Sequence, residues 1–140
     1  MTRTLADRIG THGLGVLVTL KRDGRPQLSN VTYVYDGDRI RVSLTDSRAK
    51  TKNLRRDPRA SLYVGGPGGG SYLVLEGKAE LSPVAADPHD AVVDDLVDYY
   101  RTASGEHPDW DEYRRAMVAD DRLMFSMTID HAYGMPQPTD

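Results

Sequence analysis

The chain of 140 residues contains no cysteine. This absence excludes a disulfide framework, catalysis by a thiolate and zinc sites of the cysteine type. Aromatic residues make up only 7% of the sequence, with one Trp and one Phe. No apolar run approaches the roughly 20 residues that a membrane-spanning helix needs, and the first residues lack the apolar stretch of a secretion signal. We therefore expect a cytoplasmic protein.

At this length we expect a single domain, residues 1–140, with a modest hydrophobic core.

The chain is slightly acidic overall, and its charges are unevenly distributed. The formal net charge of -3 argues against a broad nucleic-acid-binding surface, which usually shows a basic excess. Residues 87–121 contain eleven Asp or Glu and three Arg. This acidic region is best interpreted as solvated helix surface, with acids favoured near the helix starts.

Short alternating segments and tight turns predict an antiparallel β structure. Asp-Gly turns at residues 23–24 and 36–37 join the first three strands as hairpins. In all we expect six strands, at residues 13–21, 26–35, 38–45, 60–64, 71–81 and 123–129. Strands this short and this numerous favour a small closed or partly open barrel, in a mainly β protein of the α+β class.

Helical periodicity appears outside these strands. Residues 5–11 form a short amphipathic segment, and residues 91–102 carry one apolar stripe. Asp109 opens a further helix, with Glu112 three residues later in a capping-box arrangement. We expect the last two helices to cover the barrel or to contact a second subunit.

The most informative segment is basic. Residues 47–59 hold six of the eighteen Lys and Arg residues of an otherwise acidic chain. They predict a helix that Asp46 or Ser47 caps and that ends at Asp57, because Pro58 restricts the residue before it.

Four residues of this segment are expected in the first turn of the helix: Ser47, Arg48, Lys50 and Thr51. Exposed backbone N–H groups, the helix dipole, two hydroxyls and two cations favour a phosphate there. A solvated cationic face is the alternative. Arg55, Arg56 and Arg59 exceed what one phosphate requires, so they either face solvent or meet additional negative charge on the ligand.

The strand at residues 26–35 is unusually polar. Gln27 and Ser29 share a face with Val31 and Tyr33, and Asn30 adds a further polar side chain. These groups could offer hydrogen bonds to a planar polar ring that lies along the strand. Polar side chains facing water on an edge strand are the alternative.

A resemblance to a known family extends over nearly the whole chain. It rests on the segments GLGVLVTLKRDGRPQLSNVTYVYD, SRAKTKNLRRDPRASL, SYLVLEG, EHPDWDEYRRAMV and HAYG. They resemble the split-barrel flavin and deazaflavin oxidoreductases related to pyridoxamine 5'-phosphate oxidase. Within that superfamily the likeness is greatest to the actinobacterial branch that uses coenzyme F420, a deazaflavin with a phospholactyl and oligoglutamate tail. The resemblance implies a six-stranded antiparallel split β-barrel (an FMN-binding split barrel) with flanking helices, forming a homodimer with two cofactor sites at its interface.

The resemblance also implies roles for individual residues. The ring of the cofactor would lie against Gln27, Ser29, Asn30 and Val31. The phosphate would be held by Ser47, Arg48, Lys50 and Thr51, and Tyr72 would lie near the tail. We add the hypothesis that Arg55, Arg56 or Arg59 attracts the tail carboxylates.

The implied activity is hydride transfer from reduced F420 to a small conjugated organic substrate, with water, Tyr72 or Tyr133 as proton donor. An FMN-binding pyridoxamine 5'-phosphate oxidase-like protein is one alternative, although the arginine and histidine substrate motif at the C-terminus of that enzyme is missing. A non-catalytic carrier of flavin or deazaflavin is another, and nucleic-acid binding through the basic helix is a third. The four His residues show no metal-binding spacing, so no metal is expected.

Overall fold

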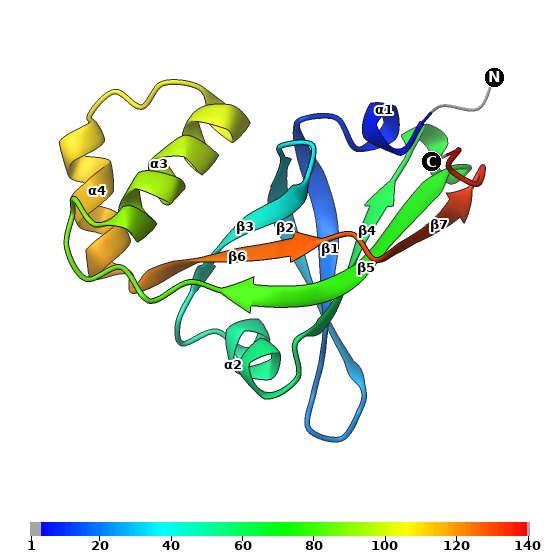
Figure 1. The fold of residues 1–140 in the computed structure, drawn as a ribbon, viewed down its shortest axis with the longest axis horizontal. Helices are drawn as coiled ribbons and strands as arrows, with labels where there is room; N and C mark the ends of the chain where they lie inside the picture. Colours follow the sequence, from blue (N-terminus) through cyan, green and yellow to red (C-terminus); the bar gives the residue numbers. More distant parts are fainter. Residues whose placement is uncertain (1–3, 140) are drawn as a thin grey trace.

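The computed structural model describes residues 4–139, which form a barrel of antiparallel strands (Figure 1). The sheet order is β4-β1-β2-β3-β6-β5-β7, and an additional pairing of β4 with β5 closes six strands into the barrel. The strands are β1 (His12–Leu20), β2 (Pro26–Tyr35), β3 (Arg39–Thr45), β4 (Arg59–Gly65), β5 (Tyr72–Leu81), β6 (Arg122–Thr128) and β7 (His131–Met135). The helices are α1 (Leu5–Ile9), α2 (Ala49–Arg56), α3 (Ala91–Ser104) and α4 (Trp110–Ala119), with a 3-10 turn η1 (Pro67–Gly69).

All six predicted strands are confirmed within one or two residues, but β7 was not predicted. This strand has only five residues, and it pairs with Tyr72–Glu76 of β5, beyond the stretch of β5 that pairs with β6. A side chain at Gly134 would collide with the carbonyl oxygen of Tyr72, so glycine permits the close approach of β7 to β5. A short strand that contains glycine lacks the alternating β-branched pattern from which strands are predicted.

The core of the barrel is built from one face of each strand. Ile40, Val42 and Leu44 of β3 are at most 1% exposed, as their predicted alternation requires. Leu123, Phe125 and Met127 pack against them from β6 and are fully buried. Burying apolar side chains of this size stabilises the fold by roughly 1.5–3 kcal/mol each.

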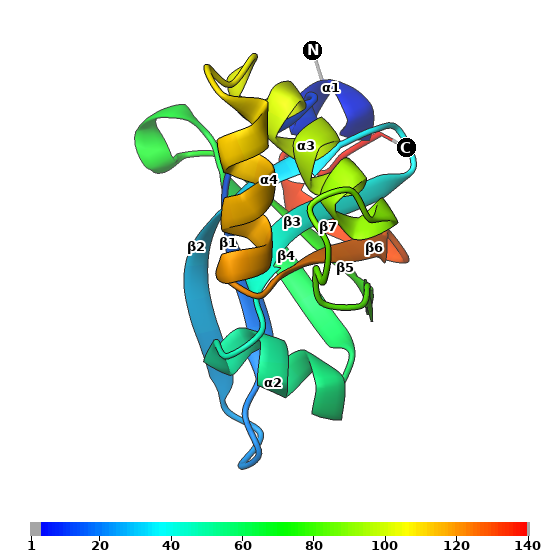
Figure 2. The same cartoon turned by 90° about the vertical axis from the view of Figure 1, so that its left-hand side faces the viewer.

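The four helices lie at three places around the barrel. α1 covers one end, where the Tyr33 hydroxyl donates to the Ile9 carbonyl at 2.6 Å, and α2 lies at the opposite end (Figures 1 and 2). α3 and α4 form a hairpin beside the barrel. The hairpin has its own apolar cluster, which includes Leu96, Tyr113 and Met124 of β6.

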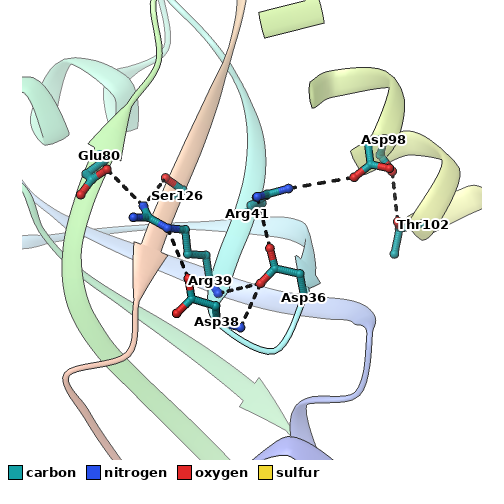
Figure 3. A network of polar contacts seen from close by, with 8 residues as sticks. All are labelled: Asp36, Asp38, Arg39, Arg41, Glu80, Asp98, Thr102 and Ser126. Atoms are coloured by element: carbon teal, nitrogen blue, oxygen red, sulfur yellow. Dashed lines mark hydrogen bonds and ion pairs between the residues drawn. The ribbon is translucent and has the colours of Figure 1, made fainter. Parts of the chain in front are cut away.

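Ion pairs join the outer surface of β3 to its surroundings (Figure 3). Arg41 lies 3.2 Å from Asp36 and 4.0 Å from Asp98 of α3. Arg39 donates to Glu80 at 3.1 Å and to Ser126 at 3.3 Å. Such partly exposed pairs contribute at most about 1 kcal/mol each. Arg39 and Arg41 therefore already have acidic partners within the chain.

The start of α2 differs from the prediction. Arg48 is the N-cap residue and no side chain caps the helix, so the expected cap by Asp46 or Ser47 is wrong. The carbonyl of Thr45, at the end of β3, accepts hydrogen bonds from the Arg48 amide (3.2 Å) and from the Thr51 hydroxyl (2.8 Å). This turn carries the chain past Ser47 before the helix begins. The predicted end at Asp57 is confirmed, since Asp57 is the C-cap.

The predicted N-cap of α4 is confirmed. The Asp109 carboxylate accepts from the Glu112 amide at 3.1 Å. In a complete capping box the Asp109 amide would donate to the Glu112 side chain. Here the Asp109 amide donates instead to Nδ1 of His107 at 2.9 Å. Within residues 4–139 no helix is both long enough and apolar enough to cross a membrane.

Candidate functional site

The barrel wall is interrupted between β2 and β3. β1 and β2 form nine residue pairs, whereas among the described residues β2 and β3 form only two, Val34–Arg41 and Tyr35–Ile40. Residues 26–33 of β2 therefore have no strand partner on the side of β3. We call this unpaired stretch the split.

Tyr99 of α3 bridges one end of the split. Its hydroxyl donates to the Thr32 carbonyl of β2 at 2.6 Å. Burial raises the pKa of the Tyr99 phenol, while a hydrogen bond from the Ser43 backbone of β3 and the charge of Arg122 act in the opposite direction. The helical hairpin is thus anchored to both strands that border the split.

The polar residues of β2 face two directions. Gln27 and Ser29 lie opposite Thr19 and Leu17 of β1, both fully buried, so the predicted shared inward face with Val31 is confirmed. The oxygen of the Ser29 hydroxyl is buried and has no hydrogen-bond partner within residues 4–139. A buried polar atom without a partner costs free energy, which a ligand group could recover.

The other residues that were predicted to contact the cofactor ring differ in which of their atoms a ligand could reach. Val31 is 8% exposed, and its side chain packs in the core, so only its backbone can meet a ligand. Asn30 lies on the opposite face of β2, next to Val16 of β1, and is exposed. Gln27 already accepts a hydrogen bond from the Thr19 hydroxyl at 3.0 Å.

Two cations stand at the start of α2 without an acidic partner. Arg48 is exposed and Lys50 is partly buried. No carboxylate in residues 4–139 lies within ion-pair distance of either one. Burial lowers the pKa of Lys50, and the neighbouring charges of Arg48 and Arg122 lower it further. Lys50 thus lies close enough to Arg48 and Arg122 to be affected by their charges.

The structure adds Arg122, which the sequence did not suggest. Arg122 opens β6 and lies opposite Thr45, the residue that ends β3 before α2. It is distant from the basic segment in the chain, and a single arginine before an apolar strand carries no recognisable signal. We call Arg48, Lys50 and Arg122 the cation cluster.

The two predicted hydroxyl ligands differ in accessibility. Ser47 is exposed just before the helix. Thr51 is fully buried, and its hydroxyl donates to the Thr45 carbonyl. Its hydroxyl hydrogen is therefore used within the chain, where it supports the turn that leads into α2.

Each arginine in the second half of the basic segment has a partner within the chain. Arg55 lies 2.5 Å from Asp46, and Arg59 lies 2.8 Å from Asp57. Arg56 donates to the Leu20 carbonyl (2.8 Å) and to the Asn53 side chain (2.9 Å). Contact of these arginines with a cofactor tail stays a prediction.

Tyr72 is distant from the cation cluster within one chain. It pairs with Gly65 at the far end of β4, while α2 precedes the start of that strand. The seven residues of β4 lie between the end of α2 and the position of Tyr72, and a strand of this length spans roughly 20 Å. The Tyr72 ring stacks on Tyr63, with centroids 5.9 Å apart.

The outside of the barrel carries a broad apolar surface. Leu14 is 78% exposed and Leu28 is 59% exposed, unusually high values for leucine. A hollow of about 500 Å3 is lined by Val16, Val18, Leu28, Ser61, Tyr63, Val74 and Tyr133. We call this surface of β1, β2, β4, β5 and β7 the outer apolar face. Exposed apolar surfaces of this kind are typical of interaction sites.

Within residues 4–139 no group of three or more His, Asp or Glu residues is arranged to hold a metal ion. The ionisable groups that stand out are the cations beside the split, whose chemistry suits an anionic ligand.

A comparison with known protein families identifies the family of this chain. A family model described as pyridoxamine 5'-phosphate oxidase matches residues 1–135. This chain belongs to the pyridoxamine 5'-phosphate oxidase family. The predicted fold class, a split barrel with flanking helices, is confirmed by this match and by the observed topology.

Several solved structures share the fold. An F420 reductase is 26% identical, with 85% of this chain and 87% of that chain covered and a TM-score of 0.62. A conserved hypothetical protein from Mycobacterium tuberculosis is 22% identical, with 97% and 88% covered and a TM-score of 0.70. A pyridoxamine 5'-phosphate oxidase-like protein from Listeria innocua is 17% identical, with 87% of each chain covered and a TM-score of 0.62. The last two similarities establish the fold alone.

Proposed function

We propose that this protein is a coenzyme F420-dependent reductase that transfers hydride from the reduced deazaflavin to a small conjugated organic substrate. The observation that carries the proposal is the group of cations at the start of α2, which have no acidic partner in residues 4–139 and follow β3, the strand that borders the split. The likeness to an F420 reductase supports the choice of cofactor within the family.

The residues present fit a planar cofactor with an anionic tail. Ser47, Arg48 and Lys50 would hold the phosphate, because two cations and the free N–H groups of the helix start favour an anion. The exposed Asn30 side chain and the backbone edge of β2 that has no partner in β3 would contact the polar edge of the ring. When bound, the deazaflavin supplies the hydride. The protein contributes orientation and a shielded pocket.

FMN is the second candidate cofactor. It also carries a phosphate, so Ser47, Arg48 and Lys50 would hold it as well. Members of the pyridoxamine 5'-phosphate oxidase family bind flavins such as FMN, which supports this alternative. A carrier without catalytic activity would use the same site.

We further propose that two copies of the chain associate through the outer apolar face. This face exposes Leu14, Leu28 and Met135, all more than half exposed, and covering them would remove apolar surface from water. Replacing Leu28→Glu would place a charge in that interface, and we expect a monomer by light scattering. The exposed substitution Arg22→Glu, in the β1–β2 turn, serves as control. A wild-type protein that is already monomeric would contradict the dimer.

The enzymatic proposal is tested by a reductase assay. Oxidation of reduced F420 would be followed by absorbance with quinone-like and conjugated lactone substrates. We expect turnover that depends on the protein and is lost in the variant Arg48→Gln/Lys50→Gln. Tight cofactor binding without turnover on any substrate would favour the carrier, and turnover with FMN alone would favour the flavin enzyme.

A further inference from the structure

We infer that Arg122 completes the anion site at the start of α2, as a third cation that binds the phosphate of the ligand, and that Ser43 positions its guanidinium. The identity of the ligand as a cofactor rests on the proposed function. The anion site itself can be tested with inorganic phosphate.

The backbone places Arg122 beside the start of the helix. Arg122 is the ladder partner of Thr45, and the Thr45 carbonyl accepts the Arg48 amide that begins the helical turn. One residue further on, the Asp46 amide donates to the Asp121 carbonyl at 3.0 Å. Two strands thus fix Arg122 next to the turn that carries Arg48.

The side chain of Arg122 lacks the partners that other arginines have. Its Nη1 donates to the Ser43 hydroxyl at the long distance of 3.4 Å, and its buried Nε has no partner in the described part of the chain. Arg39, Arg41 and Arg55, by contrast, each lie within 4.0 Å of a carboxylate. A partly buried charge without compensation is unfavourable, and a bound anion would relieve it.

The tyrosines near Arg122 do not neutralise it. Burial raises the pKa of Tyr113 to about 12, although the charge of Arg122 acts to lower it. Burial likewise raises the pKa of Tyr99. Both phenols therefore stay uncharged near neutral pH. The charge of Arg122 instead adds to that of Arg48 around Lys50.

The chemistry of arginine suits this role. A guanidinium presents its N–H groups in a planar fork that matches two oxygens of a phosphate, whereas an ammonium acts as a point charge. Losing one charge-assisted hydrogen bond weakens binding about tenfold to a hundredfold. We expect a loss in this range for Arg122→Gln and a smaller loss for Arg122→Lys.

The test combines phosphate titration with thermal unfolding of the full chain. Inorganic phosphate would be titrated into the wild type, Arg122→Gln, Arg122→Lys and Ser43→Ala, followed by amide chemical shifts of residues 48–51. Arg122→Gln should lose most of the phosphate affinity, while its melting temperature without ligand should equal or exceed that of the wild type, because an uncompensated charge is removed. The control Arg115→Gln alters an exposed arginine of α4 and should change neither quantity.

Three results would overturn the inference. They are a wild type that does not respond to phosphate, equal phosphate affinity in Arg122→Gln, and a loss of affinity accompanied by a clear fall in the ligand-free melting temperature, which would indicate a structural role. Phosphate binding through Arg122 together with no binding of F420 or FMN would refute the proposed function and leave the anion site established.

Discussion

The two halves of the basic segment, residues 47–59, are similar in sequence and different in structure. In the first half, Arg48 and Lys50 have no acidic partner in the described chain, and the pKa of Lys50 is lowered. In the second half, Arg55 and Arg59 each pair with an aspartate and Arg56 satisfies two acceptors. A cluster of positive charge therefore indicates a ligand only where the chain supplies no acidic partner or hydrogen-bond acceptor for it.

In the second half of the basic segment, Arg56 takes part in hydrogen bonds that stabilise the fold. Arg56 donates to Asn53, Asn53 donates to the Thr19 hydroxyl, and Thr19 donates to Gln27. This series of hydrogen bonds ties α2 to β1 and β2. Substitutions in the two halves should consequently affect different quantities, ligand affinity in the first and stability in the second.

The largest effect is expected for Arg48→Gln/Lys50→Gln. Losing two charge-assisted hydrogen bonds of roughly 1.5–3 kcal/mol each should weaken cofactor binding by at least about a hundredfold. Fluorescence titration of the cofactor measures this. Lys52→Gln, an exposed lysine of the same helix, is the matched control and should bind nearly as well as wild type. Equal losses of cofactor affinity in the two variants would show that Arg48 and Lys50 have no specific role in binding.

Arg56→Ala should show the opposite behaviour. Removing its two hydrogen bonds leaves the Leu20 carbonyl and the Asn53 oxygen without this donor, which should lower the free energy of unfolding by about 1–3 kcal/mol. Urea denaturation measures this loss. Arg59→Ala, which breaks only an exposed ion pair, should leave the free energy of unfolding nearly unchanged. A large loss of cofactor affinity in Arg56→Ala with unchanged stability would contradict a structural role for Arg56.

Charge reversal of Arg55, Arg56 and Arg59 together tests the tail hypothesis. If these arginines attract the tail carboxylates, the affinity for long-tailed F420 should fall more than that for a tail-less analogue. Because all three already have partners, we expect a difference of less than about tenfold. Equal effects on both ligands would remove the tail hypothesis and leave the phosphate site intact.

The smallest effect concerns the protonation of Lys50. The charge of Arg122 is one of the causes that lower the pKa of Lys50, so Arg122→Gln should raise that pKa toward its ordinary value. Titration of the lysine side chain by NMR measures the shift, with Arg115→Gln as control. An unchanged pKa in Arg122→Gln would show that the two cations do not share one site.

Local patterns predicted the barrel strands, since most of them alternate apolar and polar residues and Asp-Gly turns mark the first hairpins. They did not predict β7, because its place depends on a close approach at Gly134. Sequence spacing also brought Arg48 and Lys50 together, as near neighbours on one helix start. It could not find Arg122, whose position follows from the pairing of β6 with β3. Nor could it show that Asp46 would pair with Arg55 instead of capping α2.

The most direct measurement is the affinity of the purified protein for F420 and for FMN, determined side by side for the wild type and for Arg48→Gln/Lys50→Gln. We predict that the wild type binds F420 more tightly than FMN and that the double substitution abolishes most of the F420 binding. Tight FMN binding with undetectable F420 binding would contradict the proposed cofactor, and F420 binding that survives the double substitution would contradict the proposed site.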